Sequence, residues 1–425
     1  MTNEFGTRRR NHGAFTTAMS RRAVLQAGAA TAMAATGLTR VERALANSAI
    51  APFTYHAPES TLDDLRRRLA HARWPERETV TDWSQGVPLA RLRALVEYWR
   101  TDYDWRRCEA RLNGFNQYRT EIDGLDIHFL HVRSPHASAL PMIITHGWPG
   151  SVIEFFKIIE PLTNPAADGG QAQDAFHVVA PSLPGFGFSG KPAGPGWNAD
   201  RIARAWAALM HRLGYDRYVA QGGDWGSVVT TEMARQQPAG LAAIHLNMPF
   251  VIPDPVPTEG LSAEERRAVE AYQRFLSDGF GYFLLQATRP QTIGYALTDS
   301  PVGQAAWIYE KFHAWTDNDG DPEDALTRDE MLDTIMLYWL TETAASSARM
   351  YLENADVTGT PPVIEIPVGC SIFPGEIVPA PRIWAERVYP DLIHWNELDR
   401  GGHFAAFEQP ALFTRELRDC FRSLR

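Results

Sequence analysis

The stretch that most constrains the fold is residues 222–226, Gly-Gly-Asp-Trp-Gly. Residues 218–221 before it predict a buried strand, and residues 227–236 after it have the small and apolar side chains of a helix. A strand, a tight glycine-flanked turn and a helix would hold the central residue, Asp224, exposed at the carboxyl end of a sheet strand. Many hydrolytic enzymes carry a serine nucleophile in that position. The sequence therefore predicts that Asp224 is a nucleophile presented by a parallel sheet.

An aspartate in this position changes the class of reaction. A carboxylate is a poor attacker of an ester or amide, because the product is an anhydride. It attacks an sp³ carbon that bears a strained or good leaving group, and the resulting alkyl-enzyme ester is then cleaved by water. We therefore expect ring-opening of an epoxide or displacement of a halide. Such a pentapeptide alone also serves as an ordinary turn, so the prediction depends on the rest of the chain.

Two further apolar runs upstream predict neighbouring strands. Residues 141–145 are followed by His-Gly-Trp-Pro-Gly-Ser (146–151), a turn in which Pro149 fixes the backbone so that the Trp148 N–H can face the site. That N–H and the N–H of Trp225, which follows the nucleophile, are expected to form an oxyanion hole. Residues 176–180 predict a second strand, followed by a Pro- and Gly-rich loop and a helix over 199–213. This order is typical of a parallel sheet wrapped by crossover helices.

The C-terminal region supplies a candidate base. Residues 392–398 predict a strand, and residues 399–408 (DRGGHFAAFE) place His403 in a glycine-rich loop after it. A solitary histidine is more often a surface or core residue. The chain order of nucleophile, acid and histidine favours a general base at this position.

Taken together, the motifs HGWPGS (146–151), GGDWG (222–226) and RGGHFAAFE (400–408) resemble the epoxide hydrolases of the α/β-hydrolase fold. The resemblance is to the microsomal and juvenile-hormone branch and its bacterial relatives, and it covers nearly the whole chain after about residue 50. It implies an α/β fold, a mostly parallel sheet flanked by helices, with an α-helical lid inserted after about residue 250 and an N-terminal helical meander. It implies that Asp224 is the nucleophile and His403 the water-activating base.

The same resemblance assigns the acid of the triad. The acid in this branch is a glutamate in a Phe-Pro-x-Glu setting, which residues 373–376 match, so Glu376 carries over. Residues 363–373 are largely apolar and predict a strand that would end just before it. Asp399 is the nearest rival, although it lies within four residues of His403.

The leaving oxygen of an epoxide needs a proton donor, and a tyrosine hydroxyl is neutral and donating at neutral pH. In the family two lid tyrosines take this role. The segments 278–290 and 346–354 resemble the family's tyrosine segments and point to Tyr282 and Tyr351. The chain has 13 tyrosines, and three others in the same lid compete: Tyr295, Tyr309 and Tyr338.

Composition excludes several other classes. The formal charge of the 425 residues is −10, which disfavours nucleic acid as a partner. Three scattered cysteines are too few for a disulfide framework, and no metal or cofactor motif is present in the sequence. We expect a small apolar epoxide and water as partners, because aromatic side chains are abundant in the lid: Trp307, Phe312, Trp315 and Trp339. The sequence leaves the oligomeric state open.

The first 46 residues predict export. Residues 20–25 (SRRAVL) resemble a twin-arginine signal, and residues 44–46 (ALA) form a typical cleavage site. The alanine-rich stretch over 23–38 is too short and too weakly apolar to span a membrane. We expect a periplasmic or extracellular protein with no stable membrane anchor after signal removal. A disordered basic tail and an uncleaved anchor are the alternatives.

We expect five segments: the signal over 1–46, an epoxide hydrolase N-terminal region over 47–117, core over 118–250, lid over 251–360 and core over 361–425. In the N-terminal region, residues 62–69 predict an amphipathic helix capped by Ser60 or Thr61. By resemblance this region wraps the hydrolase core. Residues 117–132 predict a hairpin around Asp123-Gly124.

Two other functions stay open from the sequence. A haloalkane dehalogenase would share Asp224 and His403, and the Trp225 indole could donate to a halide, but it would need neither the lid tyrosines nor this N-terminal region. A non-catalytic ligand-binding member of the fold is the second alternative, because fold does not imply function.

Overall fold

The computed structural model of the chain describes residues 49–355 and 362–425. The predicted signal over 1–46 lies outside the described residues. The unit described below spans Ile50–Arg425. Within the described part of the chain, no helix is long and apolar enough to cross a membrane.

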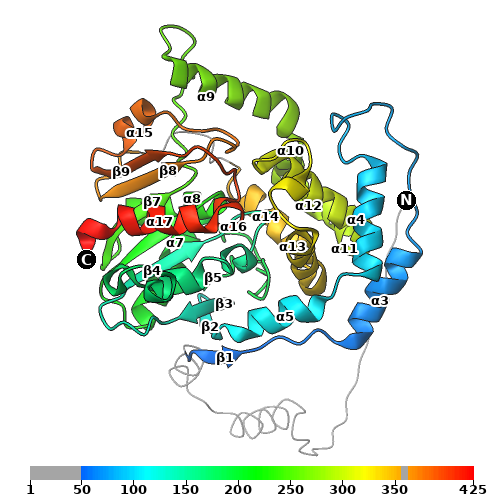
Figure 1. Cartoon of the computed structure of the whole chain (residues 1–425), viewed down its shortest axis with the longest axis horizontal. Helices are drawn as coiled ribbons and strands as arrows, with labels where there is room; N and C mark the ends of the chain where they lie inside the picture. Colours follow the sequence, from blue (N-terminus) through cyan, green and yellow to red (C-terminus); the bar gives the residue numbers. More distant parts are fainter. Residues whose placement is uncertain (1–48, 356–361) are drawn as a thin grey trace, which may run out of the picture. The chain divides into compact units, whose positions relative to one another are not determined.

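One sheet organises the described residues, with nine strands in the order β1-β2-β3-β5-β4-β6-β7-β8-β9 (Figure 1). The strands between β5 and β9 in this order are parallel to their neighbours, whereas the pairs β1–β2, β2–β3 and β3–β5 are antiparallel. The mostly parallel sheet predicted from the sequence is confirmed. The strands are β1 (Ala51–Phe53), β2 (Gln117–Ile122), β3 (Leu125–Val132), β4 (Leu140–Thr145), β5 (Phe176–Pro181), β6 (Tyr218–Gly222), β7 (Leu241–Leu246), β8 (Val368–Ile372) and β9 (Leu392–Glu397).

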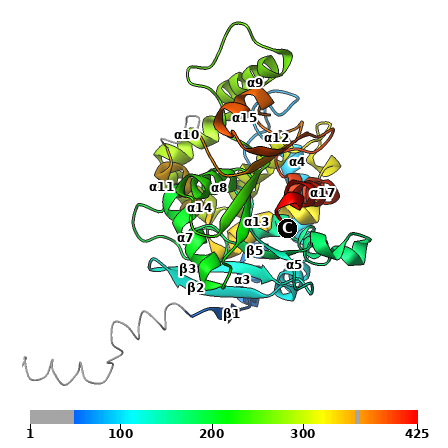
Figure 2. The same ribbon diagram turned by 90° about the vertical axis from the view of Figure 1, so that its left-hand side faces the viewer.

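The helices that flank the sheet cover both of its faces, and Figure 2 shows α7 and α8 on one side and α17 on the other. Because both faces are covered, a central strand is expected to be largely apolar, and every residue of β6 is buried. The flanking helices are α6 (Ile159–Thr163), α7 (Ala199–Arg212), α8 (Trp225–Gln236), α15 (Arg382–Val388), α16 (Ala405–Glu408) and α17 (Pro410–Cys420).

Of two strand predictions, the hairpin over 117–132 is confirmed and the strand over 363–373 is shorter than expected. The hairpin is confirmed: Ile122 pairs with Leu125, and Asp123 and Gly124 form the two-residue turn with φ of 51° and 78°. The strand expected over 363–373 is shorter, because β8 begins only at Val368. Pro367 precedes it, and a proline has no N–H to donate to a sheet ladder.

A helical segment separates β7 from β8, and we call its residues 263–353 the lid. It contains α9 (Ala263–Arg274), a π-helical turn (Phe275–Gly279), α10 (Gly281–Thr288), α11 (Pro290–Asp299), α12 (Pro301–Trp315), α13 (Arg328–Thr341) and α14 (Ala344–Glu353). Helix α14 packs against α10 and α11. The Ser346 hydroxyl donates to the Gly185 carbonyl at 2.6 Å, which ties α14 to the core loop after β5. The segment bounds predicted from the sequence stay predictions.

The N-terminal region contacts both the lid and the core. Helices α3 (Glu59–Ala70) and α4 (Leu89–Thr101) pack on α12, and α5 (Trp105–Gly114) packs on α13, while the α5 side chain Arg111 lies over the core residue Phe156. Tyr98 and Tyr103 donate to lid aspartates, and the Trp99 indole contacts Met336 at 3.2 Å. The expected contact with the core sheet comes from β1, which pairs with β2. The amphipathic helices thus bury their apolar faces against the lid.

The predicted cap of α3 was wrong. The helix begins at Glu59 directly after Pro58, and neither Ser60 nor Thr61 caps it. Pro58 has a φ of −58° and an extended ψ of 137°, so the chain turns into the helix immediately after it. Ser60 and Thr61 therefore lie inside the first turn.

Candidate active site

Asp224 occupies the turn between β6 and α8 in a conformation that is rare for a residue with a side chain. Its φ is 52° and its ψ is −130°. Such a backbone costs on the order of 1–3 kcal/mol and persists only where the surroundings enforce it. A Cβ on Gly222 would overlap the Gly226 carbonyl, and a Cβ on Gly226 would overlap the Thr145 carbonyl. The glycine frame is therefore required by close approach of backbone to backbone.

The loop after β4 meets the Asp224 carboxylate. The Trp148 N–H donates to Asp224 Oδ1 at 2.7 Å. A Cβ on Gly147 would overlap the same carboxylate, so a glycine is needed there as well. Trp225 is the first residue of α8, where a backbone N–H has no acceptor within the helix. Of the two expected donors, the Trp148 N–H forms a hydrogen bond with Asp224, and the Trp225 N–H belongs to the next residue along the chain.

His146, in the same loop, has a structural position. Its ring contacts the Gly147 carbonyl at 2.9 Å through Nδ1 and accepts from the Leu183 N–H at 3.2 Å through Nε2. Burial lowers the pKa of His146 to about 4. This neutral ring links the loop after β4 to the loop after β5.

The predicted base and acid form a buried pair beside Asp224. His403 Nε2 lies 3.4 Å from Asp224 Oδ2, and His403 Nδ1 lies 2.7 Å from Glu376 Oε1. Burial disfavours charge on the ring, but the Glu376 carboxylate and the hydrogen bond to Asp224 outweigh it and raise the pKa of His403 well above 6.5. The rival acid, Asp399, is exposed to solvent. The structure therefore brings Asp224, His403 and Glu376 together.

The loop that carries His403 is organised by Glu408, a role that the sequence did not reveal. Its buried carboxylate accepts from the N–H groups on either side of His403, those of Gly402 at 3.0 Å and Phe404 at 2.9 Å. It also accepts from the Asp317 N–H at 2.8 Å, which joins the loop to the end of α12. Burial raises the pKa of Glu408 to about 7. The only sequence signal was its place in the motif after His403.

The two predicted tyrosines lie on different lid helices and meet over the site. Tyr282 comes from α10 and Tyr351 from α14, and their ring centroids are 5.6 Å apart. The Tyr351 ring packs edge-on against Trp225 at 4.9 Å, and the Tyr282 ring stacks on Trp148 at 5.2 Å. Burial, reinforced by the Asp224 charge, raises the pKa of both hydroxyls well above 10. Both therefore hold their protons throughout the neutral range.

The Tyr351 hydroxyl is buried and has no hydrogen-bond partner among the described residues. The Trp225 and Tyr282 side chains approach it without hydrogen-bond geometry. A buried hydroxyl in this state is a donor available to a bound ligand.

Of the three competing tyrosines, two lie away from the site, and the third, Tyr338, lies near Asp224 but has its hydroxyl engaged. Tyr295 is 71% exposed. Tyr309 packs near Trp83, in the N-terminal region, at 5.8 Å. The Tyr338 hydroxyl is already committed, because it donates to the Gly150 carbonyl at 2.9 Å.

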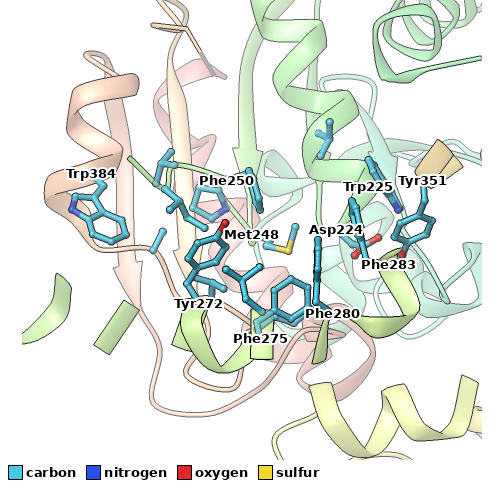
Figure 3. Close-up of a pocket in the computed structure, with 18 of the residues that line it drawn as sticks. Asp224, Trp225, Met248, Phe250, Tyr272, Phe275, Phe280, Phe283, Tyr351 and Trp384 are labelled. Atoms are coloured by element: carbon cyan, nitrogen blue, oxygen red, sulfur yellow. The ribbon is translucent and has the colours of Figure 1, made fainter. Parts of the chain in front are cut away.

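Asp224 borders two cavities of different size and chemistry. The large cavity, of about 110 Å³, extends from Asp224 and Tyr351 at one end to Trp384 at the other (Figure 3). Its lining is aromatic and aliphatic apart from Asp224 and the tyrosine hydroxyls, and it includes Trp225, Met248, Phe250, Tyr272, Phe275, Phe280, Tyr282 and Phe283. This space suits an apolar molecule whose reacting end lies at Asp224.

The small cavity, of about 20 Å³, lies next to Asp224 and His403. Its other polar lining residues are Thr145, His146, Glu154, Gln221 and Asn247. A space of this size with several polar groups holds about one water molecule. Glu154 was not among the site residues predicted from the sequence. Its signal was the Ser-x-x-Glu pattern at 151–154, and the structure forms a capping box there.

Within the described part of the chain, no group of three or more His, Cys, Asp or Glu side chains is arranged to hold a metal ion. Cys108, Cys370 and Cys420 are free and buried.

The chain matches two protein families. Residues 50–155 match "Epoxide hydrolase N terminus" and residues 141–291 match "alpha/beta hydrolase fold". A Stigmatella aurantiaca protein named "Putative epoxide hydrolase" is 67% identical over 376 residues, which are 88% of this chain and 86% of the relative.

Solved structures are similar along most of their length. The structure of Aspergillus niger epoxide hydrolase has a TM-score of 0.80 at 33% identity and covers 89% of this chain and 97% of its own. Juvenile hormone epoxide hydrolase from the silkworm Bombyx mori has a TM-score of 0.81 at 30% identity and covers 89% of this chain and 96% of its own.

Proposed function

The chain belongs to the epoxide hydrolases of the α/β-hydrolase fold, and from this premise we propose how it turns an epoxide into a vicinal diol. Asp224 attacks an epoxide carbon and forms an ester, and water activated by His403 then cleaves that ester. The observation that carries the proposal is the position of Asp224 between two cavities. One contains the tyrosine hydroxyls, and the other contains the base.

The first step takes place in the large cavity. An Asp224 carboxylate oxygen bonds to an epoxide carbon, the carbon–oxygen bond of the ring breaks, and Tyr351 or Tyr282 gives its proton to the leaving oxygen. A positioned general acid contributes typically 10²–10⁴-fold. The apolar lining supports this step, since a carboxylate is a stronger nucleophile where little water solvates it.

The second step takes place on the side of the small cavity. Water donates a proton to His403 Nε2 and attacks the ester carbonyl carbon, and the N–H groups of Trp148 and Trp225 stabilise the negative oxygen. Collapse of the tetrahedral intermediate releases the diol, which takes its proton from His403, and the proton left on the Asp224 carboxyl group replaces the one that the tyrosine gave up in the first step. Glu376 keeps the ring oriented and stabilises its positive charge.

The charge on Asp224 links the two steps. In the free enzyme the Asp224 carboxylate helps to hold a proton on His403. Alkylation turns that carboxylate into a neutral ester, so the pKa of His403 falls when the ring has to act as a base. The first step thus favours the neutral His403 ring, which is the form that can act as a base.

A panel of substrates tests this proposal. Purified protein incubated with apolar epoxides and with short haloalkanes should release diol from the epoxides and no halide. The paired lid tyrosines support this expectation, because halide displacement needs no proton donor of that kind. Halide release without diol formation would contradict the proposal.

We also propose export by the twin-arginine route, on the basis of Arg21-Arg22 and the Ala-Leu-Ala sequence at 44–46. Replacing both arginines by lysine should retain the protein in the cytoplasm. N-terminal sequencing of the exported form should begin near Asn47. Full-length protein beginning at Met1 in the cytoplasm of the native host would contradict export.

A further inference from the structure

The small cavity beside Asp224 contains a carboxyl group that the two-step mechanism does not use. We propose that Glu154 is a positioning residue that accepts a hydrogen bond from the water molecule that cleaves the ester. This inference rests on the proposed function and adds a residue to its second step.

Glu154 reaches the cavity from the short helix η1 (Val152–Phe155), which follows the Trp148 loop. Its Oε1 accepts from the Ser151 N–H at 2.9 Å, and the Ser151 hydroxyl accepts in return from the Ile153 N–H at 3.2 Å. A Cβ on Gly150 would overlap the Glu154 carboxyl group. The side chain therefore occupies the place that a side chain at position 150 would take, and its direction is fixed.

The attacking water has two protons to place. One goes to His403 Nε2, and the other needs an acceptor so that a lone pair of the water faces the ester carbon. Two of the possible acceptors in the small cavity are already engaged: Asn247 Oδ1 accepts from Gln221 at 2.9 Å, and both ring nitrogens of His146 have partners. Glu154 has one oxygen bound to Ser151 and a second oxygen to offer.

Charge also connects Glu154 to the reacting groups. Burial raises the pKa of Glu154 to about 8, the His403 charge lowers it, and the Asp224 charge raises it. When Asp224 becomes a neutral ester, its repulsion on Glu154 is lost. The His403 charge, which acts on Glu154 in the opposite direction, also falls in that step, so the charges of both reacting groups act on the pKa of Glu154.

Glu154→Gln tests the role, because it keeps an oxygen for the Ser151 N–H and replaces the second oxygen with a donating NH₂ group. In single turnovers with an apolar epoxide, alkylation should stay within about twofold of the native rate. Breakdown of the ester should slow by between about tenfold and 10²-fold, the scale expected when a reacting group is misplaced. Ester should therefore accumulate on Asp224 in the steady state and be detectable by mass.

Glu330→Gln is a matched control, because Glu330 forms the same capping box with Thr327 on α13 and lies outside both cavities. Both rates should remain native in this variant. A misfolded fraction would lower the amplitude of alkylation but would leave the ratio of the two rates unchanged, so the test does not depend on full folding.

Equal slowing of both steps in Glu154→Gln, or native ester breakdown, would overturn the role of Glu154. So would a larger loss of ester breakdown in Thr145→Val, since Thr145 Oγ1 is a buried polar atom of this cavity that has no hydrogen-bond partner among the described residues. An absence of ester even in His403→Gln would overturn the two-step mechanism itself. The two failures are therefore distinguishable.

Discussion

On one side of Asp224 lies a cavity of about 110 Å³ lined by aromatic rings and two buried tyrosines, and on the other lies a cavity of about 20 Å³ lined by His403, Glu154 and two amide side chains. The first can take an apolar molecule but offers it few polar partners. The second has room for about one water molecule and offers it a base. The difference suggests that each half of the reaction has its own environment and that the carboxylate of Asp224 is the group shared by both.

This division predicts that variants separate by step. Changes on the large-cavity side should slow alkylation, and changes on the small-cavity side should slow ester breakdown. A variant that slowed both steps equally without unfolding would show that the cavities do not act separately.

The largest effect that separates the steps is expected for His403→Gln. Without a base, ester breakdown should fall on the order of 10³-fold or more, while alkylation continues because Asp224 and the tyrosines remain. The measurement is the mass of the intact protein after mixing with epoxide, which should increase by the mass of one epoxide on Asp224. Turnover at the native rate would show that another group activates the water.

The next effect is expected for Tyr351→Phe and Tyr282→Phe. Each should slow alkylation by about 10²-fold, since a general acid is lost, and should leave breakdown of a preformed ester little changed. Tyr295→Phe is the control, because that side chain is 71% exposed and should have no effect on either step. If the double Tyr282/Tyr351 variant alkylates at the native rate, another donor protonates the epoxide.

The smallest effect is a difference in pH dependence between the steps. Glu376 and Asp224 raise the pKa of His403, and a protonated ring cannot act as a base. Ester breakdown should therefore fall about tenfold for each pH unit below the pKa of His403 in the alkyl-enzyme. Alkylation should stay flat across neutral pH, since the pKa of each tyrosine lies well above 10.

Glu376→Gln sharpens this test. Removing the carboxylate should lower the pKa of His403. The pH range over which the rate of ester breakdown rises should therefore move to lower pH by about 1 unit or more. The plateau rate should fall as well, because the ring is oriented less well. A pH range that stayed in place would show that Glu376 does not act on the charge of His403.

Much of the fold and family followed from local sequence patterns. The glycine frame around Asp224, the Trp148 loop and the order of Asp224, Glu376 and His403 are encoded in short motifs, so they could be read without a structure. The predicted parallel sheet and the membership in the epoxide hydrolases are confirmed.

The sequence did not reveal features that depend on tertiary contacts. Glu408 orients the His403 loop through three backbone N–H groups, and no local pattern indicates which donors it meets. Glu154 matched a capping pattern, but only the folded chain shows that its carboxyl group borders Asp224. The N-terminal region was expected on the core, and the apolar faces of its helices alone could not show that α12 and α13 of the lid also cover them.

The central claim is that the ester on Asp224 links the two cavities, and one labelling experiment tests it directly. A single turnover with enzyme in excess over epoxide, in water enriched in ¹⁸O, should give unlabelled diol. The first diol takes its new oxygen from Asp224, and the label from water enters the Asp224 carboxylate, where mass analysis of the peptide can detect it. Label in the diol of the first turnover, with none in Asp224, would mean that water attacks the epoxide directly and would contradict the account.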